Sequence, residues 1–162
     1  MNKKNIYDLI KSKNIWHEIT EHEAVFNMEE LSKIEILYPE YGSKNIFIRD
    51  DKKNNYYLIT IKDNKKVDLK KFRNKYKTRP LSFAKSEELM SILNLIPGSV
   101  SPLGLLNDKD LKVKFYLDKS FFTNEEIIGI HPNDNTATIW LKVNDLIDII
   151  KEHGNEINII EL

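Results

Sequence analysis

The chain has 162 residues, 41% of them hydrophobic and 31% charged, and its formal net charge is zero. These values exclude a disordered or fibrous protein and suit one core, so we expect a single domain over residues 1–162. The chain has no cysteine and four histidines, which excludes disulfides and thiol nucleophiles, and we expect no metal and no cofactor. No apolar run approaches the roughly 20 residues of a membrane span, and the first residues do not resemble a secretion signal. We therefore expect a cytoplasmic protein with no membrane partner.

Helical spacing and strand alternation predict the elements along the chain. They are, in order, a helix to about residue 13, a strand over 16–20, a helix from Asn27 to Pro39, a hairpin of 45–49 with 56–61, a helix from 68, a strand over 81–84, a helix capped by Ser86, strands over 113–117, 127–130 and 136–141, a helix ending at Gly154, and a strand over 157–160. Helices and hairpins alternate without a series of β-α-β units. We expect an α/β (α+β) domain whose single mixed, largely antiparallel sheet curls toward an open barrel and is flanked by helices.

Charge is concentrated in one segment of the chain. From Lys62 to Arg79 there are nine basic residues, accompanied by Asp63 and Asp68. Such a run is typical of a solvated surface, and it would also suit the phosphates of a bound RNA. The residues that we expect to bind RNA are Lys65, Lys66, Lys70, Arg73 and Arg79.

The run from Pro97 to Asp108, PGSVSPLGLLND, is predicted to be neither helix nor strand. Gly98, Pro102 and Gly104 interrupt it, so its backbone amides are available to turn toward a ligand. Most runs of this kind are surface connections. The run therefore predicts a site only in combination with other residues.

Two further candidates lie at predicted strand ends, where sites are often placed. Lys44 begins one strand, and His131 ends another, beside an Asn/Asp-rich turn that contains Asp134. Each has an ordinary structural explanation, as a solvated lysine, a hydrogen-bonded histidine and a turn former. The sequence has no G-x-S-x-G elbow, no Walker or dinucleotide glycine pattern and no H-E-x-x-H motif.

Four segments taken together are more specific than any of these residues alone. They are KNIFIRD at 44–50, RPLSFA at 79–84, PGSVSPLGLLND at 97–108 and HPNDNTATIWL at 131–141. In this order they resemble the freestanding prolyl-tRNA editing proteins of the YbaK/ProX aminoacyl-tRNA deacylase family, with its PrdX-like, alanine-removing branch, over about residues 21–154. The segment 98–102 matches the G-x-x-x-P loop of the family, Lys44 its strand-borne lysine and His131 its histidine. Glu23 stands where the family commonly has a proline, which bears on fine substrate preference.

The resemblance implies trans-editing, the hydrolysis of the ester in mischarged alanyl-tRNA for proline, and hence a role in translation fidelity. It implies catalytic roles for Lys44, Gly98 and His131. It implies substrate-binding roles for Asn45, Ser99, Val100, Ser101, Pro102, Phe26 and Asp134, although Val100 and Phe26 could equally be core residues. The implied partner is the aminoacylated end of tRNA, with prolyl-tRNA synthetase or an elongation factor as further partners and no DNA.

This ester is already activated, so hydrolysis requires a placed water and a stabilised oxyanion rather than a side-chain nucleophile. Three alternatives remain open from the sequence. They are a deacylase for cysteinyl-tRNA of proline, a non-catalytic tRNA-binding or regulatory module on the same fold, and a sensor of free amino acids.

Overall fold

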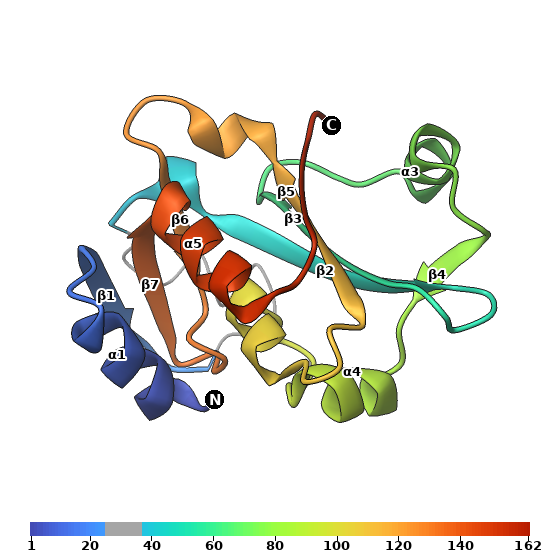
Figure 1. The fold of residues 1–162 in the computed structure, drawn as a ribbon. Helices are drawn as coiled ribbons and strands as arrows, with labels where there is room; N and C mark the ends of the chain where they lie inside the picture. The colour runs from blue at the N-terminus through green and yellow to red at the C-terminus, as the bar shows by residue number, and fades with distance from the viewer. Residues whose placement is uncertain (25–36) are drawn as a thin grey trace.

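The computed structural model describes residues 1–24 and 37–162 (Figure 1). Its helices are α1 (Lys3–Ser12), α3 (Leu69–Tyr76), α4 (Ser86–Leu93) and α5 (Val143–His153), with the 3-10 helices η1 (Pro39–Tyr41), η2 (Pro102–Asn107) and η3 (Lys119–Phe122). Its strands are β1 (His17–Glu21), β2 (Ser43–Asp50), β3 (Tyr56–Lys62), β4 (Leu81–Phe83), β5 (Val113–Asp118), β6 (Ile127–Ile130), β7 (Ala137–Lys142) and β8 (Ile157–Ile160). These elements lie close to their predicted positions. The predicted helix from Asn27, and Phe26 before it, lie outside the described residues.

The strands form two hydrogen-bonded sheets rather than the single sheet that we expected. β1, β7 and β6 form an antiparallel sheet, and the order of the other is β4-β2-β3-β5-β8. In the larger sheet β2 is antiparallel to β3 and β4, whereas β5 is parallel to both β3 and β8. An isolated parallel bridge between Gly42 and Gly129 joins the two sheets. The mixed, largely antiparallel α/β architecture is thus confirmed, but the sheets do not close into a barrel.

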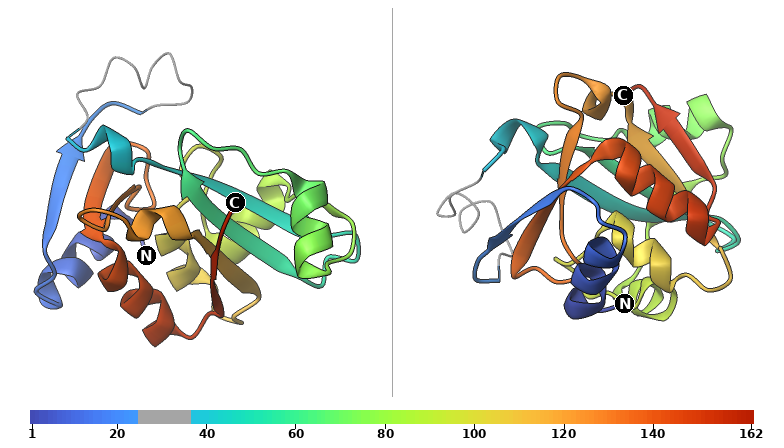
Figure 2. Two further views of the ribbon diagram at one scale, coloured as in Figure 1. Left: turned by 90° about the horizontal axis from the view of Figure 1, so that it is seen from above. Right: turned by 60° about the vertical axis from the view of Figure 1, so that its left-hand side comes forward.

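Gly129 leaves room for the indole ring of Trp140 because it has no side chain. A Cβ atom at this position would lie 2.4 Å from Cζ3 of Trp140 on the neighbouring strand. Ser43 continues the junction, since its hydroxyl donates to the carbonyl of Gly129 at 2.5 Å. From Ser43 onward β2 pairs with β3 and runs away from β6 (Figure 2).

Local sequence signals explain the helix boundaries. The side chain of Asp68 accepts hydrogen bonds from the amides of Lys70 and Lys71 at the start of α3. Ser86 is the first residue of α4 and not its cap, so this prediction was wrong by one position. The cause is Glu88, whose carboxylate accepts from the amide of Lys85 at 3.1 Å and makes Lys85 the capping position.

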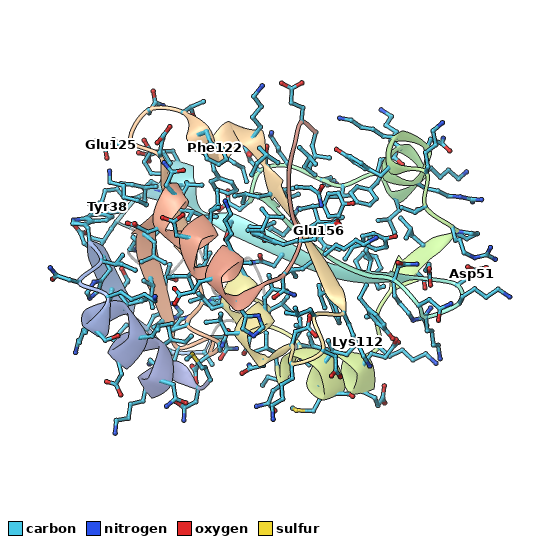
Figure 3. The ribbon with its side chains drawn as sticks, in the orientation of Figure 1. Tyr38, Asp51, Lys112, Phe122, Glu125 and Glu156 are labelled. Carbon is cyan, nitrogen blue, oxygen red and sulfur yellow. The ribbon has the colours of Figure 1, made fainter. Side chains whose placement is uncertain are left out.

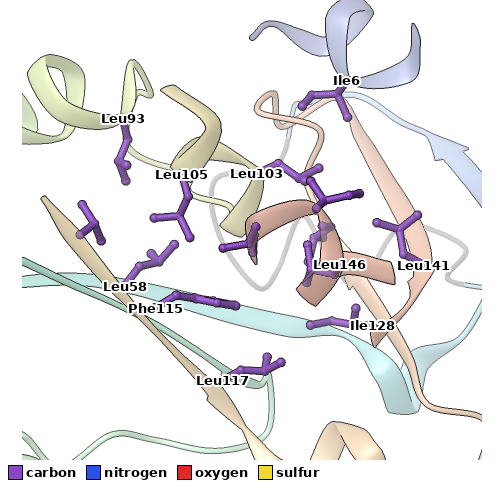
Figure 4. Close-up of a cluster of buried hydrophobic side chains, with 14 of the residues drawn as sticks. Ile6, Leu58, Leu93, Leu103, Leu105, Phe115, Leu117, Ile128, Leu141 and Leu146 are labelled. Atoms are coloured by element: carbon purple, nitrogen blue, oxygen red, sulfur yellow. The ribbon is translucent and has the colours of Figure 1, made fainter. Parts of the chain in front are cut away.

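Two apolar clusters lie on opposite faces of the larger sheet. The main cluster fills the space between the two sheets, α5 and η2, where Leu103, Phe115 and Leu146 converge (Figure 4). The second cluster lies under α3 and includes Ile48 and Phe72. Alternate residues of β2 therefore contribute to different clusters. None of the helices in the described part of the chain is long and apolar enough to cross a membrane.

Candidate active site

The segment between α4 and η2, residues 97–101, is here called the glycine loop. α4 ends at Asn94 in the left-handed conformation, and Gly98 has a φ of 91°, which favours glycine. The amide of Ser99 donates to the carbonyl of Ile96 at 3.1 Å. The second half of the predicted irregular run is helical, because Pro102 and the hydroxyl of Ser101 begin η2.

Three amides of the glycine loop are open in the sense that they have no hydrogen-bond partner in the described part of the chain. They are the amides of Gly98, Val100 and Ser101. Ser99 and Ser101 are buried, and Val100 is half-buried against the main cluster. The loop can therefore offer amide donors to a ligand from a fixed backbone.

Ser101 connects the glycine loop to His131. Its buried hydroxyl donates to the backbone carbonyl of His131 at 2.6 Å and accepts from the amide of Leu103 at 3.2 Å. The hydroxyl thus both donates and accepts a hydrogen bond within the protein. We conclude that Ser101 positions the loop and does not act as a nucleophile.

The ring of His131 is fixed in one tautomer. Its Nδ1 lies 3.0 Å from the carbonyl oxygen of Ala137, which can only accept, so Nδ1 carries the proton. Burial, above all, lowers the pKa of His131, and nearby His22 lowers it further, while the bond to Ala137 and the charge of Asp134 oppose this shift. The ring is therefore neutral at pH 7. Its Nε2 makes no hydrogen bond to the described residues and is left as an acceptor.

Residues 131–137, here called the histidine turn, are held by Asp134 and Thr136. Asp134 Oδ1 accepts from the amide of Thr136 at 2.8 Å and also from its hydroxyl. These bonds, the hydroxyl first, lower the pKa of Asp134, so the residue is an anion at neutral pH. Asp134 thus has a structural role in shaping the turn, as the turn chemistry of the sequence indicated.

His22 is a neighbour of this turn that the sequence reasoning did not select. Its Nδ1 lies 2.8 Å from the carbonyl oxygen of Glu23, its Nε2 lies 3.3 Å from Thr138 Oγ1, and its amide donates to the carbonyl of Thr136 at 2.9 Å. Pairing of β1 with β7 brings it there. The signal was present in the sequence, because His22 lies two positions beyond a predicted strand.

Lys44 and Asn45 lie on opposite faces of β2. Lys44 pairs with Ile61, a residue of the second cluster, and its ammonium group donates to the carbonyl of Lys65. Asn45 faces the other way, and its Oδ1 accepts from Thr60 Oγ1 at 2.5 Å. The structure therefore does not bring the two side chains together on one face of the strand.

The predicted RNA-binding residues fall into two groups. Lys65 donates to buried Asp118 at 3.0 Å, and Arg79 forms a two-pronged ion pair with Asp51 at 2.7 and 3.0 Å. Asp51 lies at the tip of the β2–β3 hairpin, far from Tyr38 at the opposite end of the molecule (Figure 3). The three that are exposed and make no ion pair within the described residues are Lys66, Lys70 and Arg73. Figure 1 shows that α3, which carries Lys70 and Arg73, lies apart from the β6–β7 connection.

A shallow apolar groove with a volume of about 480 Å³ opens beside the glycine loop. Its lining residues are Ser86, Glu87, Met90, Ser91, Leu95, Ile96 and Pro97. None of the predicted site residues lines it. No three His, Cys, Asp or Glu side chains come together as a candidate metal site in residues 1–24 and 37–162.

Comparison with known proteins gives a consistent result. A sequence model of the family described as "Aminoacyl-tRNA editing domain" matches residues 22–149. The chain is 39% identical to "Prolyl-tRNA editing protein ProX" of Acetoanaerobium sticklandii, over 90% of this chain and 88% of that protein. It is 33% identical to "Prolyl-tRNA synthetase associated domain-containing protein 1" of Mus musculus, over 86% of this chain and 83% of that protein.

Among solved structures, a proposed trans-editing enzyme for prolyl tRNA synthetase superposes with a TM-score of 0.70, at 16% identity, over 99% of this chain and 96% of that one. At this identity the likeness shows the fold alone. The family match and the ProX relative carry the assignment, and they agree with the resemblance carried by the four sequence segments. This chain belongs to the aminoacyl-tRNA editing domain family, among the ProX/YbaK-like prolyl-tRNA editing proteins.

Proposed function

We propose that this protein, as one editing domain over its whole length, is a trans-editing deacylase that hydrolyses the ester of alanyl-tRNA charged on the proline tRNA. The observation that carries the proposal is the set of open amides at Gly98, Val100 and Ser101, fixed next to His131 by the hydroxyl of Ser101. Backbone donors in such a loop suit the oxygen of an ester carbonyl as it gains negative charge.

In the proposed reaction, a water oxygen adds to the ester carbonyl carbon, and the bond from that carbon to the ribose oxygen then breaks. The ribose oxygen takes up a proton, so the products are free alanine and tRNA with a free terminal hydroxyl. The loop amides hold the carbonyl oxygen. Nε2 of His131 accepts a hydrogen bond from the ribose hydroxyl or from the ammonium group of the amino acid.

Lys44 has a different part in this proposal. Its ammonium group already donates to the carbonyl of Lys65, on the face of β2 away from Asn45. This placement favours contact with the phosphate or sugar of the terminal adenosine over activation of water. Asn45, on the face of the main cluster, then contacts the amino acid, and exposed Lys66, Lys70 and Arg73 hold phosphates farther along the RNA.

The proposed selectivity for alanine rests on size. A proline-shaped synthetase pocket cannot strongly reject the smaller alanine, because each missing methylene is worth about 1–3 kcal/mol. A second, smaller pocket can admit alanine and exclude proline. Val100, half-buried in the glycine loop, is our candidate for its wall, and Val100→Ala should narrow the rate difference between alanyl and prolyl esters.

The test is hydrolysis of alanyl, cysteinyl and prolyl esters on the proline tRNA by the purified chain, with and without chelator. We expect hydrolysis of the alanyl ester alone, at the same rate with and without chelator. Hydrolysis of the cysteinyl ester instead would mean that the reaction is the same but the substrate is cysteinyl-tRNA. A rate that falls with chelator would contradict a metal-free reaction. Tight tRNA binding without turnover would favour the non-catalytic module, and binding of free alanine without tRNA binding would favour the sensor. Added prolyl-tRNA synthetase or elongation factor tests whether either delivers the substrate.

A further inference from the structure

We propose that Lys3 of α1 is a positioning residue of the editing site, which holds the histidine turn in the shape that presents His131 and Asp134. The proposal rests on the editing function above, but its structural basis is independent of it. The family match begins at residue 22, after α1 and β1. Figure 1 nevertheless shows α1 beside the β6–β7 connection, so the N-terminal helix is a neighbour of the site.

Lys3 contacts the turn through Thr136. Its Nζ lies 2.8 Å from Thr136 Oγ1, and this contact joins residues 133 positions apart. An ammonium group can only donate, so Thr136 Oγ1 accepts from Lys3 and its own proton points to Asp134 Oδ1. Lys3 thereby fixes the direction of the hydroxyl that orients Asp134, and its charge also contributes to the lowered pKa of that carboxyl, after the bonds from Thr136.

Lys3 is itself held in place. Glu21 Oε2 accepts from Lys3 Nζ at 2.7 Å, and Glu21 Oε1 accepts from the hydroxyl of Tyr7, one helical turn along α1, at 2.8 Å. Burial and this bond to Glu21 raise the pKa of Tyr7, so it remains a donor. Glu21 directly precedes His22, whose amide donates to the carbonyl of Thr136. Thr136 is therefore fixed through its hydroxyl, its amide and its carbonyl.

The contacts of Lys3 with Glu21 and Thr136 fix the orientation of Thr136 more than they stabilise the fold. The side chains of Lys3 and Glu21 are 27% and 58% exposed, and ion pairs with this exposure add little to the free energy of folding. Loss of Lys3 should leave the fold intact and release Thr136 Oγ1 from its donor. Asp134 and the following backbone, including the carbonyl of Ala137 that binds His131, would then lose a fixed orientation.

The test compares Lys3→Met with two other variants. Lys4→Met changes an exposed neighbour on the same helix, whose side chain forms no hydrogen bond or ion pair within the described residues, and Lys3→Arg keeps the donor. We expect Lys3→Met to lower the single-turnover rate of ester hydrolysis about tenfold, since small misplacements of reacting groups are costly. Its affinity for uncharged tRNA and its melting temperature should match those of Lys4→Met. Lys3→Arg should restore most of the rate.

Amide hydrogen exchange at Thr136 provides a readout that needs no turnover. We expect faster exchange in Lys3→Met than in Lys4→Met, because the amide is bonded to the carboxylate that Lys3 helps to orient. Unchanged exchange, an unchanged hydrolysis rate, or a loss confined to tRNA affinity would each overturn the proposal. If the unaltered protein hydrolyses none of the esters, the editing function fails, and exchange at Thr136 still decides whether Lys3 holds the turn.

Discussion

Two polar clusters of this molecule differ in how completely their hydrogen bonds are satisfied. In the first, Glu88 accepts from Arg49 Nε at 3.0 Å, from the hydroxyl of Tyr56 at 2.7 Å and from the amide of Lys85. In the second, the glycine loop and the histidine turn leave amides of the loop and Nε2 of His131 without a partner among the described residues. A cluster with satisfied groups can stabilise the fold, whereas open, fixed groups are available to a substrate.

The largest effect on stability should come from Glu88→Gln in the satisfied cluster. The side chains of Arg49 and Glu88 are 11% and 15% exposed, and breaking such a pair should cost about 3 kcal/mol in the free energy of unfolding. Hydrolysis at a temperature where both proteins are folded should not change. Exposed Glu87→Gln is the matched control, and equal losses of stability in the two variants would contradict the comparison.

Glu88 also predicts a pH dependence of stability. Although burial opposes it, hydrogen bonding to Tyr56, Lys85 and Arg49 lowers the pKa of Glu88 to about 2. A carboxyl with a lowered folded pKa contributes stability above its unfolded pKa and loses that contribution as pH falls through the folded pKa. Denaturant unfolding between pH 5 and about pH 2 should therefore show a steeper loss in the unaltered protein than in Glu88→Gln.

Lys44→Met should have the largest effect on the reaction. We expect the hydrolysis rate to fall about 100-fold, as for removal of one electrostatic group that acts in the transition state. Stability should change little, because Lys44 forms its hydrogen bond at a half-exposed strand start. Exposed Lys52→Met, on the turn of the same hairpin, is the control. A normal rate in Lys44→Met would remove Lys44 from the site.

A smaller effect is expected at His131, whose pKa is lowered mainly by burial. The hydrolysis rate should be constant above the ordinary histidine range and fall at lower pH, where the ring gains a proton and Nε2 can no longer accept. His131→Asn should lower the plateau rate about tenfold and remove this acidic limb. His17→Asn, on β1, should leave the profile unchanged. If the rate still falls at low pH in His131→Asn as it does in His17→Asn, the titrating group is not His131.

The smallest expected effect is on tRNA binding, and it distinguishes basic residues that form no ion pair among the described residues from those that form one. Arg73→Gln should weaken tRNA binding about twofold at moderate salt and make the slope of log affinity against log salt shallower by about 0.7–0.9. Arg79→Gln should change neither quantity, because its guanidinium is already paired with Asp51. If Arg79→Gln weakens tRNA binding as much as Arg73→Gln, ion pairing within the protein does not determine which basic residues bind RNA.

Periodicity and turn chemistry predicted most elements, because these signals act over a few residues. The arrangement of the two sheets could not be predicted, since they meet where Gly42 contacts Gly129, a residue distant along the chain. Of the site, the glycine loop and His131 were visible as local motifs. The contact of Lys3 with Thr136 was not, because it joins distant positions.

The partners of the basic residues could not be predicted from the sequence, because they are distant along the chain. Lys65 meets Asp118 across 53 positions, and Arg79 meets Asp51 across 28. Composition alone cannot reveal that such partners neutralise a cation. Exposure and pairing in the structure separate Lys70 and Arg73 from these two residues.

The junction of Gly42 with Gly129 has a consequence for engineering the protein. Lys44 and His131 each lie two positions beyond one of these glycines, so the distance between them is set by a backbone contact and not by their own side chains. Val100 of the glycine loop can therefore be exchanged in a library selected for new amino-acid preference while that spacing persists. Substitutions at Gly129 should be left out of such a library, because any side chain there would collide with Trp140 and change both strands at once.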